Sequence, residues 1–583
     1  MDYHVADPPF YSRRPQAILD PIRVGFILAL IVIGFFVIIP ILLLLINTFE
    51  VGALGEETHL GLSNWASVLT DARVHKAMWN TFTLAITQQA IALPIALVLA
   101  WLFARTDLPA RGWFEFSMWV ALFLPPITVT LAWILIFDEF NGIANRILQH
   151  FHFVTNGPFN IHSWWGIVWI HLVTASIPAK VMLLTPIFRH LDASFEEAGW
   201  TLGSTRHSTL VRIVFPLLKP GILVVALLGL IRSLESFEIE WILGSPAQIQ
   251  VYSTYIYRSL QDTPPSYGPA SVMSVLILVV VVPLIILQQR FISKSNHVTV
   301  TSKFRSNNVK LHAWKWPIFL VLFLICCIMT ILPLACVIMA TFMTRFGRFD
   351  ARQVWTFEQW QSLLSNQRFF DALANTVIIG ISAAFIATLV FSLIAYVSIN
   401  VRFKWKRIMD YLIWLPSAVP GIVLGLGYLW LFLGTPFLRP FYGTLTILVL
   451  VVSLSVMTLN MQMIKSSMLQ VGSELEQASK VSGASFQYTF RRIIIPLVLP
   501  TIIVVGTLTF SNAARSTSYV ALLTTTDNQP LSMFQLEAAA DGRLELASTV
   551  GVVVAILTLG IALIGRYIGN RFGGVISSTK PKE

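Results

Sequence analysis

Residues 196–220 read EEAGWTLGSTRHSTLVRIVFPLLKP, and residues 476–500 read EQASKVSGASFQYTFRRIIIPLVLP. Both stretches open with a carboxylate, pass a glycine, continue through basic and aromatic residues, and end at two prolines four residues apart. The matched positions differ by 280 throughout; they are Glu196, Ala198, Gly203, Arg212, Ile213, Pro216, Leu217 and Pro220 in the first copy and Glu476, Ala478, Gly483, Arg492, Ile493, Pro496, Leu497 and Pro500 in the second. Two copies of one polar segment indicate a duplicated chain that carries this segment once in each half.

The residue types in this repeated segment predict a short surface helix followed by a break. Carboxylates in the first turn favour a helix start, Gly203 or Gly483 allows the backbone to turn sharply, and Pro216 or Pro496 limits how the next helix begins. An ordinary connector between two membrane spans is the alternative interpretation. Two copies at equivalent positions favour a shared functional role over that alternative.

The sequence on both sides of these segments is strongly apolar. Of the 583 residues, 56% are apolar and only 12% are charged, whereas soluble domains carry about 25% charged residues. The mean hydropathy is +0.73, and a water-soluble surface on so long a chain would need far more ionised groups. The composition therefore excludes a soluble enzyme and an intrinsically disordered chain, and it predicts an all-α integral membrane protein.

Apolar stretches long enough to cross a bilayer recur along the whole chain, since a membrane-spanning helix needs about 20 apolar residues. We predict about twelve, six in each half, with approximate limits 24–47, 79–104, 114–137, 164–188, 220–243, 268–289, 317–342, 374–400, 409–433, 443–464, 498–521 and 547–565. The first stretch lacks the short apolar core and small-residue cleavage site of a signal peptide, so we interpret it as a retained helix.

A second pair of motifs supports the duplication. Asn64-Trp65 is followed, fifteen residues after the tryptophan, by Asn80-Thr81. Gln359-Trp360 is followed at the same interval by Asn375-Thr376, and these motifs differ by 295 positions rather than 280. The first half therefore carries fifteen additional residues, which we place in the loop around Phe140–His162. Because both halves begin on the same side of the membrane, we expect parallel repeats related by an axis along the membrane normal.

Basic residues predict the orientation of the spans. With the N-terminus in the cytoplasm, most Lys and Arg residues fall on cytoplasmic segments, as the positive-inside rule requires. One of these segments joins the halves and contains no Asp or Glu but six basic residues, Arg290, Lys294, Lys303, Arg305, Lys310 and Lys315. Since basic residues are spread over many short loops, the net charge of +11 reflects membrane topology, and we expect no nucleic-acid partner.

These observations divide the chain into five predicted segments: a cytoplasmic N-terminal segment (1–23), a first half (24–289), a basic cytoplasmic linker (290–316), a second half (317–565) and a cytoplasmic tail (566–583). Both termini are therefore predicted to lie in the cytoplasm.

Several charged and polar residues fall within the predicted spans. They are Arg232, Glu235, Glu238 and Glu240 in the fifth span, Asn512 and Arg515 in the eleventh, and Lys180 in the fourth. A charge at mid-bilayer costs about 2.5–3.5 kcal/mol on insertion scales, so we expect these side chains to face protein or water along a translocation path. Arg232 and Glu235 are three residues apart and can pair on one helix face. Lys180 is a weaker candidate, which could neutralise a nearby glutamate.

Glu235 and Arg515 occupy equivalent positions under the 280 offset. Opposite charges at related positions are expected either to pair between the halves, as a gate or as a structural contact, or to touch the solute directly. The structural pair is the interpretation that we favour, because charges inside a membrane usually find partners.

No motif in the sequence indicates chemistry on a substrate. The Walker A pattern G-x-x-x-x-G-K-[ST] is absent, so any phosphate-binding loop must lie on another chain. His150 and His152 lie in an outer loop without metal-ligand spacing, and Cys326, Cys327 and Cys336 share one apolar run that suits small core residues. We therefore expect no catalytic residues, no metal site and no cofactor on this chain.

The duplicated segment resembles the EAA loop of ABC importer permeases, whose pattern is Glu-Ala-Ala, three residues, Gly, nine residues, Ile, one residue and Leu-Pro. The matching residues are Glu197-Ala198-Gly199, Gly203 and Ile213-Val214-Phe215-Pro216 in the first copy and Gln477-Ala478-Ser479, Gly483 and Ile493-Ile494-Ile495-Pro496 in the second. The chain departs from the pattern at Gln477, where neighbouring Glu476 could supply the charge, and at Phe215 and Ile495. The fused layout, which includes Leu415-Pro416 and Pro420-Gly421, is similar to ferric-iron-type permeases, with thiamine-type permeases as close relatives.

This resemblance implies a fold, partners and a mechanism. Each EAA-type segment would form a coupling helix seated on one of two copies of a cytoplasmic ABC ATPase, which would hold ATP and Mg. A periplasmic binding protein would deliver the solute, with the outer loops 48–78 and 343–373 as contact surfaces, and the chain would lie in the bacterial inner membrane. Two rival hypotheses remain, namely a secondary transporter driven by an ion gradient and a membrane-embedded enzyme. The duplicated cytoplasmic segments argue against the first, because a gradient-driven carrier has no ATPase to dock.

Overall fold

The computed structural model describes residues 21–52, 59–152, 157–189, 194, 201–295, 309–400, 406–471 and 473–577. The described part consists of helices and connecting loops, with one small antiparallel hairpin, β1 (Glu50–Val51) with β2 (His59–Leu60), and isolated bridges. The helices of the first half are α1 (Pro21–Asn47), α2 (Ser63–Thr70), α3 (Ala72–Arg105), α4 (Arg111–Phe123), α5 (Pro126–Phe137), α6 (Ile143–His150), α7 (Trp164–His171), α8 (Ile177–Arg189), α10 (Arg206–Thr209), α11 (Phe215–Leu234), α12 (Tyr252–Gln261) and α13 (Tyr267–Ser295).

The second half follows the same order of long and short helices. They are α14 (Lys315–Cys326), α15 (Leu332–Ala340), α16 (Glu358–Leu364), α17 (Gln367–Phe385), α18 (Phe391–Asn400), α19 (Lys406–Trp414), α20 (Gly421–Gly434), α21 (Leu445–Ser455), α22 (Met457–Gln470), α23 (Ser473–Val481), α24 (Phe486–Thr489), α25 (Ile495–Arg515), α26 (Leu531–Ala540) and α27 (Leu544–Ser577).

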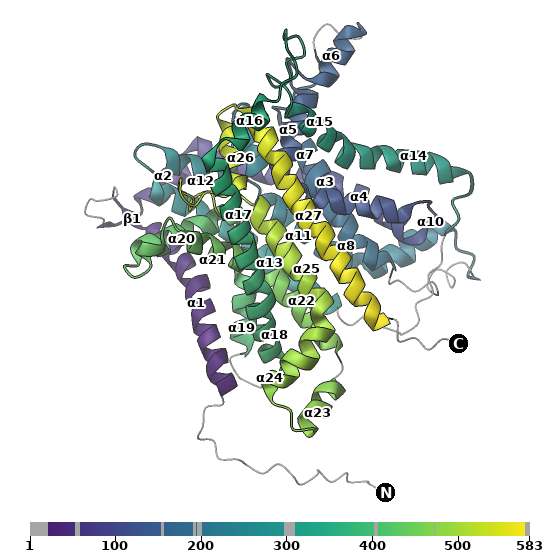
Figure 1. The fold of residues 1–583 in the computed structure, drawn as a ribbon, viewed down its shortest axis with the longest axis vertical. Helices are drawn as coiled ribbons and strands as arrows, with labels where there is room; N and C mark the ends of the chain where they lie inside the picture. Colours follow the sequence, from purple (N-terminus) through teal and green to yellow (C-terminus); the bar gives the residue numbers. More distant parts are fainter. Residues whose placement is uncertain are drawn as a thin grey trace.

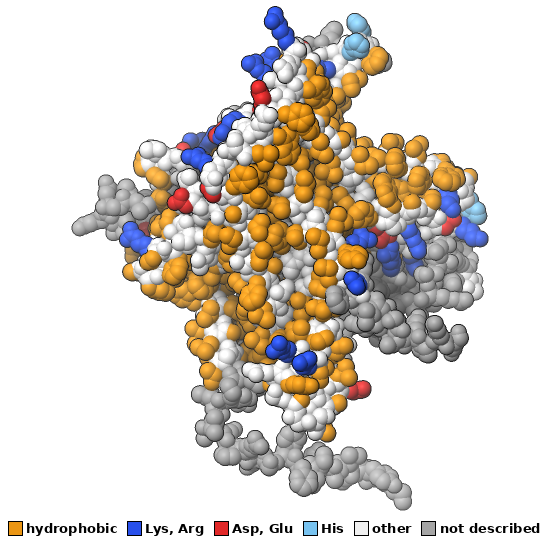
Figure 2. Space-filling view, viewed as in Figure 1, with side chains coloured by type: hydrophobic (Ala, Val, Ile, Leu, Met, Phe, Trp, Pro, Cys, Tyr) orange, Lys and Arg blue, Asp and Glu red, His pale blue; other side chains and the backbone are white. Residues whose placement is uncertain are grey.

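The number of membrane spans agrees with the sequence prediction. Within the described residues, nine helical segments are long and apolar enough to cross a membrane, and three bent helix pairs raise the number to twelve. Apolar side chains cover most of the face seen in Figure 2, and charged side chains gather toward its margins. Such a surface is unstable in water but suits lipid, so the chain is a multi-pass membrane protein.

The third span of each half is sharply broken. Between α4 and α5 the axis bends by 99°, and in the second half it bends by 112° before α20. The breaks occur at Pro125-Pro126 and at Pro420-Gly421, which differ by the same 295 positions as the Asn-Thr motifs. Proline removes a backbone donor and clashes with the preceding turn, so a helix cannot continue straight through these positions.

The first span of each half packs on the opposite half (Figure 1). In this exchange α1 contacts α18, α19 and α20 of the second half, while α14 and α15 contact α4 and α5 of the first. The two sequence repeats are therefore interlocked, and each broken span is covered by the first span of the other repeat.

The extra sequence of the first half forms α6. This helix projects at the upper end of the molecule in Figure 1, while the corresponding connection after α20 contains only a short turn at Arg439–Phe441. The prediction that the additional residues lie around Phe140–His162 is confirmed.

The limits predicted for the fifth and eleventh spans, 220–243 and 498–521, are wrong. Helix α11 ends at Leu234, and α25 ends at Arg515, where the backbone of Ser516 becomes extended. Both helices also begin earlier than predicted, because π-helical turns at Leu210–Val214 and Phe490–Ile494 lead into them. The charged residues placed at mid-span therefore lie at helix ends, where the chain turns back toward α12 or α26.

The end of the predicted linker is attached to the first half. Val309 donates its N–H to the Arg105 carbonyl (2.8 Å) and accepts from the Asp107 N–H (3.2 Å). The Asp107 carboxylate accepts from the Leu311 N–H at 2.8 Å. This hydrogen bond, together with the nearby Lys315 ammonium, lowers the pKa of Asp107. Residues 296–308 of the linker lie outside the described residues.

Candidate functional site

The second EAA-type segment (476–500), named the second coupling segment after its predicted role, folds as predicted into a short surface helix followed by a break. α23 ends at Val481, the backbone turns through Gly483 in the left-handed region (φ +77°), and α24 follows. The Ser485 hydroxyl accepts from the Tyr488 N–H at 3.2 Å and so caps α24. Gln477 and Ala478 lie exposed on α23, at the lower end of the molecule in Figure 1. The backbone of Glu476 lies in the same helix.

The first coupling segment shows the same turn where it is described. Gly203 also has φ +77°, and α10 then leads into α11 as α24 leads into α25. Pro216 and Pro496 each follow the π-helical turn that leads without a break into the long helix, so the missing N–H falls where the helical hydrogen-bond pattern is already irregular. The predicted coupling residues Glu196, Glu197 and Ala198 lie outside the described residues.

The Asn-Thr motifs hold the short helices α12 and α26. In the first half, Asn80 donates to the Gln250 carbonyl at 2.9 Å, and the Thr81 hydroxyl accepts from the Tyr252 N–H at 3.0 Å. The second half repeats both contacts, from Asn375 to the Gln529 carbonyl (3.2 Å) and from the Leu531 N–H to Thr376 (2.8 Å). Tyr252 and Leu531 are the first residues of α12 and α26, so each threonine satisfies an N–H that the helix itself cannot.

We expect Thr81→Val and Thr376→Val to destabilise the chain by about 1–3 kcal/mol each, since each leaves a buried N–H without its acceptor while keeping the side-chain volume. Thermal unfolding in detergent measures this loss. Thr70→Val is the matched control, because the Thr70 hydroxyl is exposed and bonds only within its own helix. Equal melting temperatures for all three variants would contradict the assigned role.

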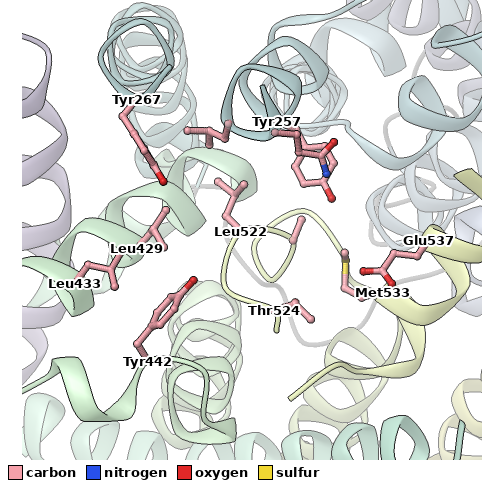
Figure 3. Close-up of a pocket in the computed structure, with 12 residues that line it drawn as sticks. Tyr257, Tyr267, Leu429, Leu433, Tyr442, Leu522, Thr524, Met533 and Glu537 are labelled. Carbon is pink, nitrogen blue, oxygen red and sulfur yellow. The ribbon is translucent and has the colours of Figure 1, made fainter. Parts of the chain in front are cut away.

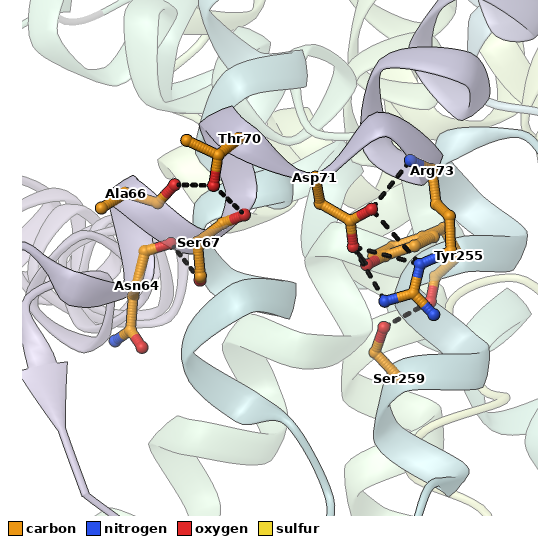
Figure 4. Close-up of polar contacts among 8 residues, drawn as sticks. All are labelled: Asn64, Ala66, Ser67, Thr70, Asp71, Arg73, Tyr255 and Ser259. Carbon is orange, nitrogen blue, oxygen red and sulfur yellow. Dashed lines mark hydrogen bonds and ion pairs between the residues drawn. The ribbon is translucent and has the colours of Figure 1, made fainter.

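A polar corner ties α12 to the start of α3 (Figure 4). Asp71 caps α3 by accepting from the Arg73 N–H at 2.8 Å, and its carboxylate also pairs with the Arg73 guanidinium at 3.0 Å. The Tyr255 hydroxyl donates to the same carboxylate at 3.3 Å. The bonds from Arg73 lower the pKa of Asp71. In the second half, Asn366 caps α17 in the equivalent way, through the Arg368 N–H at 3.0 Å.

The structure pairs Glu235 with Arg232 rather than with Arg515. Arg232 Nη1 lies 2.8 Å from Glu235 Oε2, as the spacing of three residues predicts. Among the described residues, no ion pair joins Glu235 to Arg515 in this conformation. The two positions are nevertheless equivalent, because the carbonyls that follow them, of Ser236 and Ser516, accept from hydroxyls at the starts of α12 and α26.

Arg515 makes a different contact between the halves, in which its guanidinium donates to the Leu122 carbonyl at the end of α4. In a continuous helix that carbonyl would accept from residue 126 or 125, but both are prolines and have no N–H. A charged donor from the other half therefore satisfies a carbonyl that its own helix leaves free.

Glu238 and Asn512 stabilise the same junction. Glu238 Oε1 accepts from the Thr517 N–H at 3.2 Å and so joins the first half to the second. Asn512 accepts from the hydroxyls of Ser516 (2.7 Å) and Tyr519, which fixes the turn after α25. The predicted polar residues thus gather where α11 and α25 end.

Sequence reasoning missed a buried pair next to this junction. His171 Nε2 lies 2.8 Å from Glu240 Oε1, and the Ser236 hydroxyl donates to the other carboxylate oxygen at 2.5 Å. The signal was present, since a carboxylate in an apolar run requires a partner, but its partner lies 69 residues away on another helix. Lys180 donates to the Ser176 carbonyl at 3.0 Å rather than to a glutamate.

Within the described part of the chain, no group of three or more His, Cys, Asp or Glu side chains could hold a metal ion. The described parts of the two EAA-type segments are each continuous with a long helix, α11 or α25, whose far end lies at the junction of the halves.

The family model described as binding-protein-dependent transport system inner membrane component matches residues 92–296 and 377–573. Each match contains one coupling segment, and together they cover more than half of the chain. The chain belongs to this family. As a binding-protein-dependent transport permease it is a transport component of the ABC type, and the two matches correspond to its two repeats.

Curated relatives of this permease are similar to it over most of its length or over one half. It is 25% identical over 564 residues to the "Ferric transport system permease protein FbpB" of Actinobacillus pleuropneumoniae, covering 94% of this chain and 78% of that protein. It is 25% identical over 521 residues to the "Putative ferric transport system permease protein FbpB 1" of Haemophilus influenzae (86% and 77%). The "Sulfate transport system permease protein CysT" of Salmonella typhimurium is 28% identical over 239 residues, covering 40% of this chain and 84% of that protein. The similarity to relatives named for ferric transport therefore extends over both halves.

Proposed function

We propose that this permease forms the complete membrane channel of an ATP-driven bacterial importer for ferric iron. Its similarity over both halves to permeases named for ferric transport is the observation that carries the proposal. Two copies of a cytoplasmic ABC ATPase would bind ATP and Mg, and a periplasmic binding protein would supply the ion. The chain would lie in the inner membrane with both termini in the cytoplasm.

The geometry supports alternating access between two halves. An ATPase seated on α23 and α24 would push on α25, because only a short π-helical turn separates α24 from α25. Arg515 ends α25 and contacts Leu122 of the other half, and Thr517, two residues beyond the helix, contacts Glu238. The same connection runs from Gly203 through α10 and α11 to Glu235. Closure of two ATPase subunits would therefore shift the contacts at the junction. The path between the halves would then open to the other side of the membrane.

The purified chain alone should hydrolyse no ATP, because it lacks a Walker A motif. Proteoliposomes that contain the chain, its ATPase and its binding protein should take up radioactive ferric iron only when ATP is supplied. A Walker A lysine variant of the ATPase is the matched control.

Three results would count against the proposal. ATP hydrolysis by the contaminant-free chain would contradict the division of labour between subunits. Uptake driven by an ion gradient without the ATPase would favour a secondary transporter. ATP-dependent uptake of thiamine or another solute, with no uptake of iron, would keep the importer and change its cargo.

A further inference from the structure

An apolar groove of about 270 Å³ lies on the helix that only the first half carries. It is lined by Ile143, Arg146, Ile147, His150 and Phe151, together with Phe349 of the second half. We call α6, with Phe140 before it and Phe151 after it, the outer arm. In Figure 1 the arm projects at the upper end of the molecule, and α23 of the second coupling segment lies at the lower end. An ATPase on α23 would therefore leave the outer arm on the periplasmic side.

Buried hydrogen bonds hold the outer arm in place. Asn145 is fully buried, and its side chain donates to the carbonyls of Asp138 (2.9 Å) and Phe159 (2.7 Å). The Asn145 side chain also accepts from the Phe159 N–H at 3.0 Å. These bonds fix α6 against the chain on both sides of it. A partner that binds to the arm therefore has little of it to order, and less of the binding energy is lost as entropy.

The outer arm also contacts the second half. Arg146 Nη2 lies 3.3 Å from Asp350 Oδ1, and the Arg146 guanidinium lies over the Phe349 ring, 5.8 Å from its centroid. Asp350 and Phe349 belong to the loop between α15 and α16. A protein bound in the groove would therefore contact both halves at once.

Large apolar side chains are exposed on this projection. Phe140 is 79% exposed, Phe151 64% and Ile147 51%. Figure 1 shows the outer arm beyond the ends of the long helices rather than beside them, so contact with lipid explains this exposure poorly. Exposed apolar side chains that gather outside lipid mark an interaction with another protein.

An inner cavity of about 320 Å³ is a weaker candidate for an interaction with a protein. Figure 3 shows Tyr257 and Tyr267 of the first half and Leu429 and Met533 of the second half around it. Helices of both halves surround this cavity, and a folded partner would have to separate them to enter. The groove on the outer arm lies instead on a projecting surface.

The second-half side of the groove is basic. Arg345, Arg348 and Arg352 are exposed on the loop between α15 and α16, and Figure 2 shows basic side chains at this upper end of the molecule. Asp350 is the one acidic residue between Arg345 and Arg352. Three arginines against one aspartate give this loop a net positive charge. It therefore favours an acidic partner and would also attract such a partner from a distance.

We propose that the outer arm and the loop 345–352 form the docking site for the periplasmic binding protein, and that the matching surface of that protein has an apolar centre and an acidic rim. The inference rests on the proposed function for the presence of this partner. Of the two outer loops that the sequence indicates as contact surfaces, only 343–373 contributes to this site, and α6 is added to it. The equivalent connection of the second half contains only the short turn Arg439–Phe441, so one arm serves one docked protein.

Docking of the fluorescently labelled binding protein to the full chain, assembled with its ATPase in lipid nanodiscs, tests this site. The binding protein is first saturated with the solute that it retains. Ile147→Asp/Phe151→Asp should raise the Kd at least about tenfold, because apolar anchors at the centre of an interface carry most of its binding energy. Arg348→Glu/Arg352→Glu should raise the Kd as well and should reduce its dependence on salt, because it removes the attraction between opposite charges. Unchanged thermal unfolding of both variants shows that the loss does not come from misfolding.

Phe441→Asp is the matched control. Phe441 is 45% exposed and lies on the connection after α20, which corresponds to the connection that contains α6. This variant should dock the binding protein with the wild-type Kd. Unchanged docking in both arm variants, or an equal loss in Phe441→Asp, overturns the assigned site even if ATP-driven iron uptake stands.

Two further measurements decide whether something else occupies the outer arm. Gln149 is exposed in α6, and a fluorescent label on Gln149→Cys should not be quenched by brominated lipids. Quenching would place the arm in the membrane and overturn the site. The mass of the solubilised complex should be the same in Phe151→Asp as in the wild type, whereas dissociation of a dimer in this variant would assign the arm to a second copy of the chain and also overturn the site. Uptake of a solute other than iron would refute the cargo proposal alone, because the docking assay does not depend on which solute is bound.

Discussion

Replacing Gly483 by valine should lower ATP-driven uptake by at least about tenfold while membrane insertion continues, and Gly203→Val should do the same in the other half. Both glycines have φ +77°, and a Cβ atom at either position would meet no atom within 4 Å. The effect therefore comes from backbone strain and not from a clash. A left-handed conformation costs L-residues about 1–2 kcal/mol, and a β-branched side chain makes it worse.

The expected consequence is specific to coupling. If the turn relaxes to an ordinary conformation, α23 changes its direction relative to α24 and no longer presents the same surface to the ATPase. About 1.4 kcal/mol corresponds to a factor of ten in an equilibrium, so strain of this size is enough to weaken the complex measurably. Co-purification of the ATPase measures how strongly the complex assembles, and uptake by proteoliposomes measures transport.

Two controls make the test sharp. Gly483→Asn should retain most of the activity, because asparagine tolerates the left-handed region. Gly560→Val also places a branched side chain in open space, but Gly560 lies in α27 without a positive φ, so this variant should assemble normally. Normal coupling in Gly483→Val and Gly203→Val would show that these turns do not set the docking geometry.

Hydrophobic periodicity and the duplicated motifs predict the fold of this chain well. They do not predict where individual helices end or break, because that depends on local backbone geometry. Twelve apolar stretches give the twelve spans, since length and hydropathy alone decide what can cross a bilayer. The same measure extends the fifth span from 220 to 243, because Phe237, Ile239 and Trp241 keep it apolar beyond the true end of α11 at Leu234. Hydropathy depends only on residue type and therefore does not show where the backbone turns.

The candidate site shows where symmetry in a sequence stops being informative. The offset of 280 correctly identifies Glu235 and Arg515 as equivalent, yet equivalent residues of two repeats contact each other only if they lie near the axis that relates the repeats. In this structure Glu235 pairs with Arg232, and Arg515 bonds to the Leu122 carbonyl. The partner of Arg515 is a backbone carbonyl, which has no sequence signature of its own, and the partner of Glu240 is a histidine on a distant helix.

The break in the third span leaves a backbone carbonyl that Arg515 satisfies from the other half. Leu122 is followed at three and four residues by Pro125 and Pro126, so its carbonyl has no donor in its own helix. A backbone carbonyl without a hydrogen-bond donor raises the free energy of a protein inside a membrane. Arg515 supplies the missing donor.

Arg515→Met should therefore destabilise the chain by about 1.5–3 kcal/mol, the usual value for a buried hydrogen bond to a charged group, and should reduce uptake. Methionine keeps much of the length without a donor, whereas Arg515→Lys keeps one donor and should lose less. Thermal unfolding and uptake of both variants, compared with the wild type, measure these losses.

Glu235→Gln is the matched comparison for Arg515→Met. Because Glu235 pairs with Arg232 and does not contact Arg515, the effects of Glu235→Gln and Arg515→Met should add to within about 0.3–0.5 kcal/mol. Stability and uptake of Arg515→Met equal to those of the wild type would show that the carbonyl contact is unimportant. Strong coupling between Glu235 and Arg515 would instead show that the two charges meet in another conformation of the transport cycle, and the gate between the halves would then be an ion pair that forms and breaks with each turnover.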